Sequence, residues 1–242
     1  MIKKDIQNIQ TLFLKNEDGK EMYSLITHLE DIGYVVRIQV KPDQEVKSVF
    51  FIHEDAIYET RRWPEAITID ATYKTNAHKF SLINIVGISN VSSVRGTNRL
   101  QTFAVAAAFV NAETEAAYTW VLEELRNAIW PEEKDYELPN VFVTDNERAL
   151  RNAIDNVFPE SHHLLCSWHL WNTMETKLPI GKVNAVEYRY RRCLAEEQFK
   201  AIVGSNKEQQ YLDAVSKFEQ IVTETDCFKD NGRSALIYLK EV

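Results

Sequence analysis

The sequence predicts an α/β fold, with a mixed β-sheet flanked by helices and a C-terminal all-helical region. Three observations support this prediction. Short runs of β-branched and aromatic residues occur between about residues 46 and 166, two helical patterns separate the later runs, and only helical patterns follow Trp168. The 242 residues are 45% hydrophobic and 26% charged, a globular composition that argues against disorder.

The expected elements fall into three regions. Residues 1–60 form an N-terminal helix and strand lead-in, residues 61–170 form the core, and residues 171–242 form the helical insertion region. Strands are expected at 34–40, 49–52, 66–73, 81–88, 102–109, 140–145 and 163–166. Helices are expected at 22–31, 114–130, 147–157, 183–203 and 207–223.

The connections between the core strands predict the sense of each strand. The first three strands of the core are joined by short connections and should form an antiparallel meander. The next two follow helical crossovers, the first of them capped by Thr114, and should therefore run parallel to an existing strand. The result is a five-stranded mixed sheet of the ribonuclease H type, in which the first and fourth strands are neighbours.

Two acidic residues occupy those neighbouring strands. Asp70 lies within the first core strand and Asp145 ends the fourth. A carboxylate among apolar strand residues is costly unless it is paired, hydrogen-bonded or bound to a metal ion. Two converging carboxylates predict a site for Mg²⁺ or Mn²⁺, which serves phosphoryl transfer in two-metal enzymes. The alternatives are that Asp145 or Asn146 caps the following helix, and that Asp70 is a turn residue.

A second group of candidate ligands surrounds Cys166. Cys166 and His169 have Cys-x-x-His spacing, and His162 and His163 come just before them. Such spacing can place two zinc ligands on one turn, but no second Cys/His pair occurs elsewhere. A packed cysteine with a hydrogen-bonded histidine beside the acids is therefore favoured over structural zinc. A Cys–His nucleophilic pair is favoured least, because no orienting acid is evident.

The charge balance limits how the chain can contact nucleic acid. The 36 acidic and 28 basic residues give a net charge of −8, which disfavours tight binding of nucleic acid over the whole surface. Lys74, Arg95 and Arg99 are local candidates for DNA contacts. Three cysteines without framework spacing favour an intracellular setting, and no apolar run is long enough to cross a membrane.

Several segments together carry a family resemblance. Residues 69–76, 82–89, 103–126 and 141–169 resemble the Mutator-like element (MULE) transposase domain. The resemblance implies a ribonuclease H-like core of the Asp-Asp-Glu class, which uses Mg²⁺ or Mn²⁺ to cut DNA and join its strands. Asp70 matches the first catalytic acid and Asp145 the second.

The resemblance has further implications. Cys166 and His169 match the Cys-x-x-His signature that follows the fifth strand in such transposases. The implied partners are transposon ends and target DNA, bound through additional domains outside this chain, and a second copy in a homo-oligomer. A nuclear location is implied by the resemblance alone.

The sequence departs from the family pattern at its third acid. In the family this acid is a Glu on a helix that follows a helical insertion. We expect the sequence up to Val242 to end within that insertion, before this Glu. Glu219 and Glu224 are the candidates within the chain. The leading hypothesis is therefore an incomplete catalytic core. The alternatives are a transposase-derived DNA- or protein-binding regulatory module without catalysis, and a stand-alone nuclease.

Overall fold

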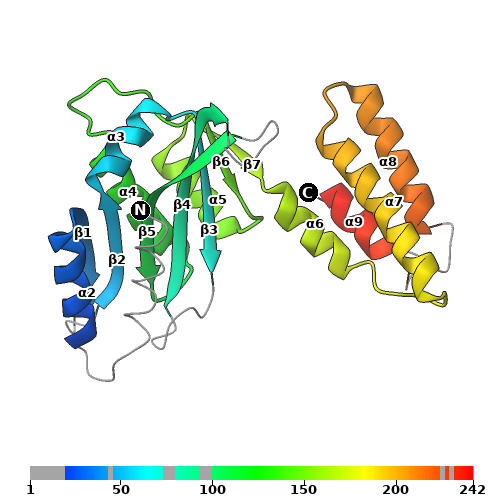
Figure 1. Cartoon of the computed structure of the whole chain (residues 1–242), viewed down its shortest axis with the longest axis horizontal. Helices are drawn as coiled ribbons and strands as arrows, with labels where there is room; N and C mark the ends of the chain where they lie inside the picture. Colours follow the sequence, from blue (N-terminus) through cyan, green and yellow to red (C-terminus); the bar gives the residue numbers. More distant parts are fainter. Residues whose placement is uncertain are drawn as a thin grey trace. The chain divides into compact units, whose positions relative to one another are not determined.

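A computed structural model describes residues 20–42, 46–72, 80–92, 100–223, 227–228 and 232–241 (Figure 1). These residues form two compact units, which divide between Leu164 and Leu165. The first unit is built on a β-sheet and the second is helical. Each contains its own cluster of buried apolar side chains.

The sheet of the first unit has seven strands among the described residues, not the expected five. Their spatial order is β1-β2-β5-β4-β3-β6-β7. The strands are β1 (Tyr34–Val40), β2 (Val46–His53), β3 (Ala66–Thr72), β4 (Ser81–Ser92), β5 (Leu100–Val110), β6 (Val141–Thr144) and β7 (His162–Leu165). All the expected strands are present, so the correction concerns which of them share a sheet.

The two additional strands come from the region expected to be a lead-in. Strand β2 pairs antiparallel with β5, and β1 pairs antiparallel with β2. Five consecutive residues of β2, from Ser48 to Ile52, are buried. A strand buried on both faces has a continuous apolar pattern, which is compatible with a position inside a sheet. The sheet therefore extends two strands beyond β5.

The remaining pairings are mixed in sense, as the connections predict. Strands β3, β4 and β5 form an antiparallel meander, and β6 pairs parallel with β3. The connection from β5 to β6 contains α4 (Glu115–Ile129), and that from β6 to β7 contains α5 (Arg148–Val157). Helical crossovers of this kind are what parallel neighbours require.

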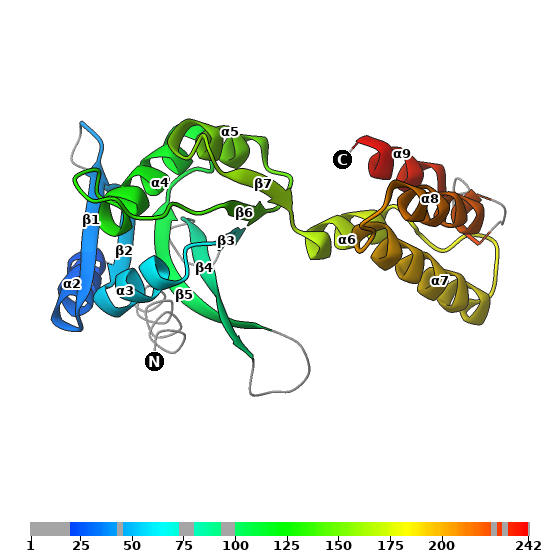
Figure 2. The same cartoon turned by 90° about the horizontal axis from the view of Figure 1, so that it is seen from above.

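Helices cover both faces of the sheet (Figure 2). Helices α4, α5 and α3 (Glu54–Arg62) pack on one face, where Tyr118 and Phe142 are among the largest buried side chains. Helix α2 (Lys20–Asp31) packs on the other face through Leu25 and Leu29, which contact Phe51 and Phe109 in a separate cluster. Each fully buried side chain of this size contributes roughly 1.5–3 kcal/mol through burial. Helix α3 lies between β2 and β3, where the sequence led us to expect no helix.

The helix starts confirm one expected cap and correct another. The Thr114 side chain accepts a hydrogen bond from the Ala117 amide at 3.3 Å and caps α4, as expected. Helix α5 is capped by Glu147, which accepts a hydrogen bond from the Ala149 amide at 3.1 Å. The cap of α5 is therefore neither Asp145 nor Asn146.

Strands β4 and β5 form a hairpin that extends away from the other strands (Figure 2). Strand β4 continues to Ser92 and β5 begins at Leu100, so the connection expected at 89–101 is partly strand. The pairing register shifts between Ile88 and Ser92, which marks a bulge. Side chains near this bulge are therefore directed differently from those in a regular ladder.

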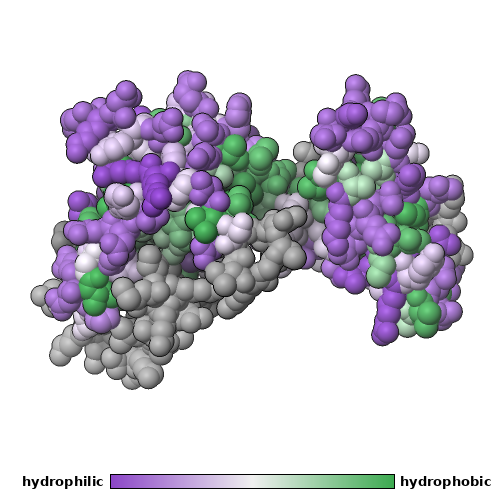
Figure 3. Space-filling model, turned by 45° about the horizontal axis from the view of Figure 1, so that its top comes forward, coloured by the Kyte–Doolittle hydropathy of each residue, from purple (hydrophilic) through white to green (hydrophobic). Residues whose placement is uncertain are grey.

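The second unit is a group of helices with its own core. Its helices are α6 (Ser167–Thr176), α7 (Ala185–Val203), α8 (Glu208–Thr223) and α9 (Arg233–Glu241). Phe199 and Phe218 are buried between α7 and α8, and Trp171 of α6 stacks against Phe199 with ring centroids 5.4 Å apart. On the face of this unit that Figure 3 shows, hydrophilic residues separate small apolar areas. Of the helices in the described ranges, none is long and apolar enough to cross a membrane.

Candidate acidic site at the ends of strands β3 and β6

Strands β3 and β6 bring Asp70 and Asp145 to the same level of the sheet. The recorded parallel pairing ends with Thr68 opposite Val143. Two residues further along each strand come Asp70, which is still in β3, and Asp145, which directly follows β6. Neighbouring strands lie about 5 Å apart. Both aspartates are half-buried, so each carboxylate is partly removed from water without being enclosed by apolar side chains.

The turn after β6 uses one oxygen of Asp145. Its Oδ1 accepts a hydrogen bond from the Glu147 amide at 3.3 Å. Glu147 in turn caps α5, because its side chain accepts a hydrogen bond from the Ala149 amide. A short run of carboxylate-to-amide hydrogen bonds thus holds the chain between β6 and α5 in place. It also fixes the position of the Asp145 carboxylate relative to the strand end.

A buried tyrosine lies beside this turn. Tyr118 of α4 is buried, and its hydroxyl hydrogen-bonds to the Glu113 side chain. Burial raises the pKa of Tyr118 strongly, and the negative charges of Glu113, Asp145 and Glu147 raise it further. The phenol therefore stays protonated at neutral pH and acts as a hydrogen-bond donor. The charges of three carboxylates act on this one hydroxyl, so its surroundings are negative.

A histidine completes the described surroundings of Asp145. His163 Nε2 of β7 lies 2.6 Å from Thr144 Oγ1, and Thr144 Oγ1 donates to the Asp145 carbonyl oxygen at 2.7 Å. Since the threonine proton is used by that carbonyl, the histidine is assigned as the donor through Nε2–H. Burial lowers the pKa of His163, as does the nearby charge of Arg151, while Asp155 and Asp145 act in the opposite direction. The imidazole is therefore held neutral.

The donor atoms at this site suit a hard divalent cation. Mg²⁺ and Mn²⁺ prefer carboxylate oxygens, which Asp70 and Asp145 supply. Glu113 Oε1, near Tyr118, is buried and has no hydrogen-bond partner among the described residues. Within the described ranges, however, no three His, Cys, Asp or Glu side chains are grouped closely enough to hold a metal ion.

The other predicted site residues belong to the second unit or fall outside the described residues. Cys166 takes the N-cap position of α6 without a capping hydrogen bond from its side chain, and His169 stands one turn further along the same helix. Glu219 lies on α8, where it pairs with Lys240 at 3.9 Å. Three candidate DNA contacts and one candidate third acid fall outside the described residues, namely Lys74, Arg95, Arg99 and Glu224.

Sequence reasoning overlooked two residues of this site. Glu113 follows the buried end of β5 and precedes the cap of α4, and Tyr118 lies one turn into that helix. An acid at the end of a buried strand was the pattern that identified Asp145, and the same pattern applies to Glu113. Nothing comparable identifies Tyr118, because an aromatic residue on the apolar face of a helix has the pattern of an ordinary core residue.

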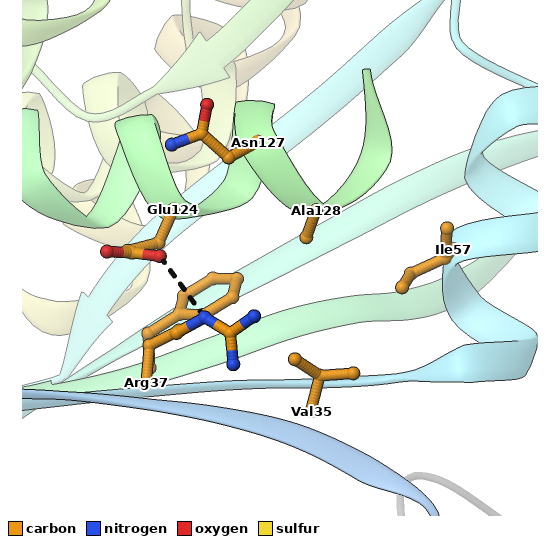
Figure 4. Close-up of a pocket in the computed structure, with 7 residues that line it drawn as sticks. Val35, Arg37, Ile57, Glu124, Asn127 and Ala128 are labelled. Carbon is orange, nitrogen blue, oxygen red and sulfur yellow. Dashed lines mark ion pairs between the residues drawn. The ribbon is translucent and has the colours of Figure 1, made fainter. Parts of the chain in front are cut away.

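A separate cavity lies at the opposite edge of the sheet. It has a volume of about 270 Å³ between β1 and the helices α3 and α4 (Figure 4). Val35, Ile57 and Ala128 form apolar walls. At its rim Arg37 Nε lies 3.8 Å from Glu124 Oε2. This ion pair satisfies both charges, and the cavity lies three strands or more away from β3, so it takes no part in the acidic site.

Comparisons with known proteins point to one family. The model of the MULE transposase domain matches residues 66–173, a range that includes Asp70, Asp145, Cys166 and His169. The chain is 27% identical over 146 residues to the protein FAR1-RELATED SEQUENCE 5 of Arabidopsis thaliana, which covers 60% of the chain and 17% of that protein.

Two other relatives from Arabidopsis thaliana match over a greater part of the chain. FAR1-RELATED SEQUENCE 7 is 20% identical over 80% of the chain and 24% of its own length, and FAR1-RELATED SEQUENCE 2 is 20% identical over 90% and 25%. The chain thus spans a quarter or less of the length of these three relatives. The chain contains a MULE transposase-type domain.

Proposed function

We propose that this domain is the catalytic core of a MULE-type DNA transposase, in which Asp70 and Asp145 hold a divalent metal ion that serves DNA strand cleavage and strand transfer. One observation carries the proposal: the parallel register of β3 and β6 brings the two aspartates to the same level of adjacent strands. The match to the MULE transposase domain over residues 66–173 supports it.

The strand order also supports a ribonuclease H-like core. Counted from β3 along the chain, the strands from β5 to β7 lie in the order 3-2-1-4-5, with an antiparallel meander followed by a parallel neighbour. This is the arrangement that the sequence pattern predicts for such a core. Strands β1 and β2 are then an extension beyond its third strand.

The residues of the site divide the work in this proposal. Asp70 and Asp145 would hold Mg²⁺ or Mn²⁺, and the chemistry supplied by such an ion would be activation of a hydroxyl nucleophile and stabilisation of the leaving oxygen of the phosphodiester. The turn between β6 and α5 orients Asp145. The Tyr118 hydroxyl stays protonated and donates a hydrogen bond to the Glu113 side chain, which limits the repulsion among the carboxylates. Neutral His163 fixes Thr144 and thereby the end of β6.

Binding of Mn²⁺ to the whole chain tests the proposal. Electron paramagnetic resonance of free Mn²⁺ measures the affinity of the wild type, Asp70→Asn, Asp145→Asn and the control Asp155→Asn, whose carboxylate lies on the exposed side of α5. We expect either active-site substitution to weaken binding at least about tenfold, since even indirect partners of metal ligands have effects of that order. Equal affinities in all four proteins would refute the metal site.

A second candidate function is a transposase-derived module that binds DNA or protein without catalysis. The hydrogen bond from the Glu147 amide to Asp145 Oδ1 favours it, because this use of the carboxylate needs no metal ion. In that case Asp145→Asn, which can still accept this hydrogen bond, leaves DNA binding unchanged and no specific Mn²⁺ site is detected. The catalytic core instead requires Mn²⁺ binding that both aspartates support.

A further inference from the structure

A second cavity of the sheet unit lies between the end of α3 and the β4–β5 hairpin. Its volume is about 240 Å³. It lies below the roughly 300–1,000 Å³ of pockets for drug-sized ligands, so it fits one small ring system. The residues around it come from 59–63, 89–91 and 101–103, which are far apart in the chain. Neither the acidic site nor the family comparison accounts for it.

Two aromatic side chains line this cavity. Trp63 ends α3 and is not part of the buried clusters of the unit, although it is half-buried. Phe103 of β5 lies opposite Gly87 of β4 in the sheet register. A Cβ atom at Gly87 would clash with the ring of Phe103. The glycine therefore lets the phenylalanine ring lie across β4, which holds this ring in place at the cavity.

Polar groups surround the aromatic pair. The guanidinium carbon of Arg62 lies 5.1 Å from the centroid of the Trp63 ring, so a cation stands over the indole face. Gln101 and Thr102 of β5 are exposed residues at the edge of the cavity, and Glu59 of α3 adds a carboxylate to its lining. An amide and a hydroxyl both donate and accept hydrogen bonds, so they can pair with the edge of a heterocycle.

The bulge in the hairpin fixes this polar rim. Ser89 Oγ donates to the Gln101 carbonyl oxygen at 3.1 Å and accepts from the Val91 amide at 3.3 Å. These bonds satisfy backbone groups that the irregular ladder leaves without strand partners. The backbone next to Gln101 is therefore held by a side chain, and the rim does not depend on an unsupported loop.

Aromatic faces, one cation and a rim of donors and acceptors together suit a nucleobase. Stacking on aromatic rings accepts any base, and the cation adds attraction to the π-system. We infer that this cavity between α3 and the β4–β5 hairpin binds an unstacked base of single-stranded DNA, with Trp63 and Phe103 as stacking surfaces. That the base belongs to a DNA strand rests on the proposed function, because a free nucleotide would present the same ring to the cavity.

Binding of labelled oligothymidylate to the whole chain tests this inference. Fluorescence anisotropy in EDTA compares wild type with Trp63→Leu, and with Tyr58→Leu as a matched control. Tyr58 is an aromatic residue of the same helix that is 66% exposed and does not line the cavity. We expect Trp63→Leu to weaken binding about 5- to 150-fold, the range that stacking of one base produces, and Tyr58→Leu to leave it unchanged.

Photocrosslinking gives a readout that a loss of folding cannot mimic. Oligonucleotides with 5-iodouracil should crosslink the wild type at Trp63 or Phe103, as located by mass spectrometry of the peptides. Equal affinity of wild type and Trp63→Leu, or crosslinks confined to other peptides, would overturn the inference. Thymidine monophosphate that binds as tightly as the oligonucleotide would also overturn it, in favour of a free-nucleotide site.

The outcome of this DNA-binding experiment can be interpreted independently of the Mn²⁺-binding experiment on the acidic site. The binding assay contains EDTA, so a missing Mn²⁺ site does not affect it. Loss of binding in Trp63→Leu together with equal Mn²⁺ affinity in Asp70→Asn would support the base pocket and refute the proposed catalysis. Intact Mn²⁺ binding with no effect of Trp63→Leu would refute only the base pocket.

Discussion

The surroundings of Asp145 come from several elements, and each neighbour affects a different property. Tyr118 from α4 stays protonated because burial and three carboxylates raise its pKa. His163 from β7 stays neutral because burial and Arg151 lower its pKa. A neutral donor on either side of an acidic turn leaves the negative charge of the carboxylates available to a cation. This balance also predicts how stability responds to pH.

Replacing His163 by Gln should make the sheet unit less sensitive to mild acid. A histidine with a lowered pKa binds a proton more readily when unfolded, so the wild type loses stability as the pH falls from about 6.5 through the folded pKa. Gln does not titrate in this range and can still donate to Thr144. Urea unfolding at pH 7.5 and 5.5 measures the difference, with the exposed His162→Gln as control. A larger acid sensitivity in His163→Gln would contradict the assignment.

The elements of the sheet unit are fixed by local signals at their ends. Helix α4 begins where the Thr114 side chain accepts the Ala117 amide, and α5 begins where Glu147 accepts the Ala149 amide. The first start could be predicted because threonine is a common cap, whereas glutamate is not among the residues usually preferred at this position. The bulge of β4 similarly depends on Ser89, whose hydroxyl satisfies the interrupted ladder.

Removing the cap of α4 should destabilise the sheet unit measurably. Thr114→Ala leaves the Ala117 amide without its side-chain acceptor, and we expect a loss of about 1 kcal/mol in the free energy of unfolding. Thr114→Ser retains an oxygen in the same place and should restore most of the stability. Chemical denaturation followed by circular dichroism measures both. The same loss in the serine variant would show that the hydroxyl is not the reason.

The molecule as a whole contains separate cores. Phe142 lies in the cluster between the sheet and the helices α3, α4 and α5, whereas Phe218 lies in the cluster of the helical unit. Both side chains are fully buried. The seven-stranded sheet has two terminal strands, β1 and β7. The acidic site and the proposed base pocket both belong to the sheet unit, on β3 and after β6 in one case and beside the β4–β5 hairpin in the other.

Emptying the helical core should affect that unit first. Phe218→Ala removes a fully buried ring and should cost about 3–5 kcal/mol, because the cavity cannot close completely. Hydrogen exchange should show the greatest loss of protection in α7 and α8, which pack around this ring. Leu212→Ala, at a half-exposed position of α8, serves as the control and should have a small effect. Equal loss of protection in both variants would contradict the assignment of the core.

Local sequence patterns are sufficient to predict most elements and the two candidate acids. Alternation and helical periodicity are local, so they identify β3 to β7 and the helices α4, α5, α7 and α8. The lengths of the connections then limit the sense of each pairing, which predicts that β3 and β6 are neighbours. Asp70 and Asp145 follow from that neighbour relation.

The partners of these residues depend on packing between elements that are distant in the sequence. Strand β2 could have belonged to a separate hairpin, and its place beside β5 depends on the burial of both its faces, which involves residues distant in sequence. Tyr118 of α4 and His163 of β7 lie close enough to Asp145 for its charge to affect their pKa, and Trp63 lines a cavity together with residues of the β4–β5 hairpin. Such contacts follow from side-chain packing between elements, and a local pattern carries no information about which elements will pack together.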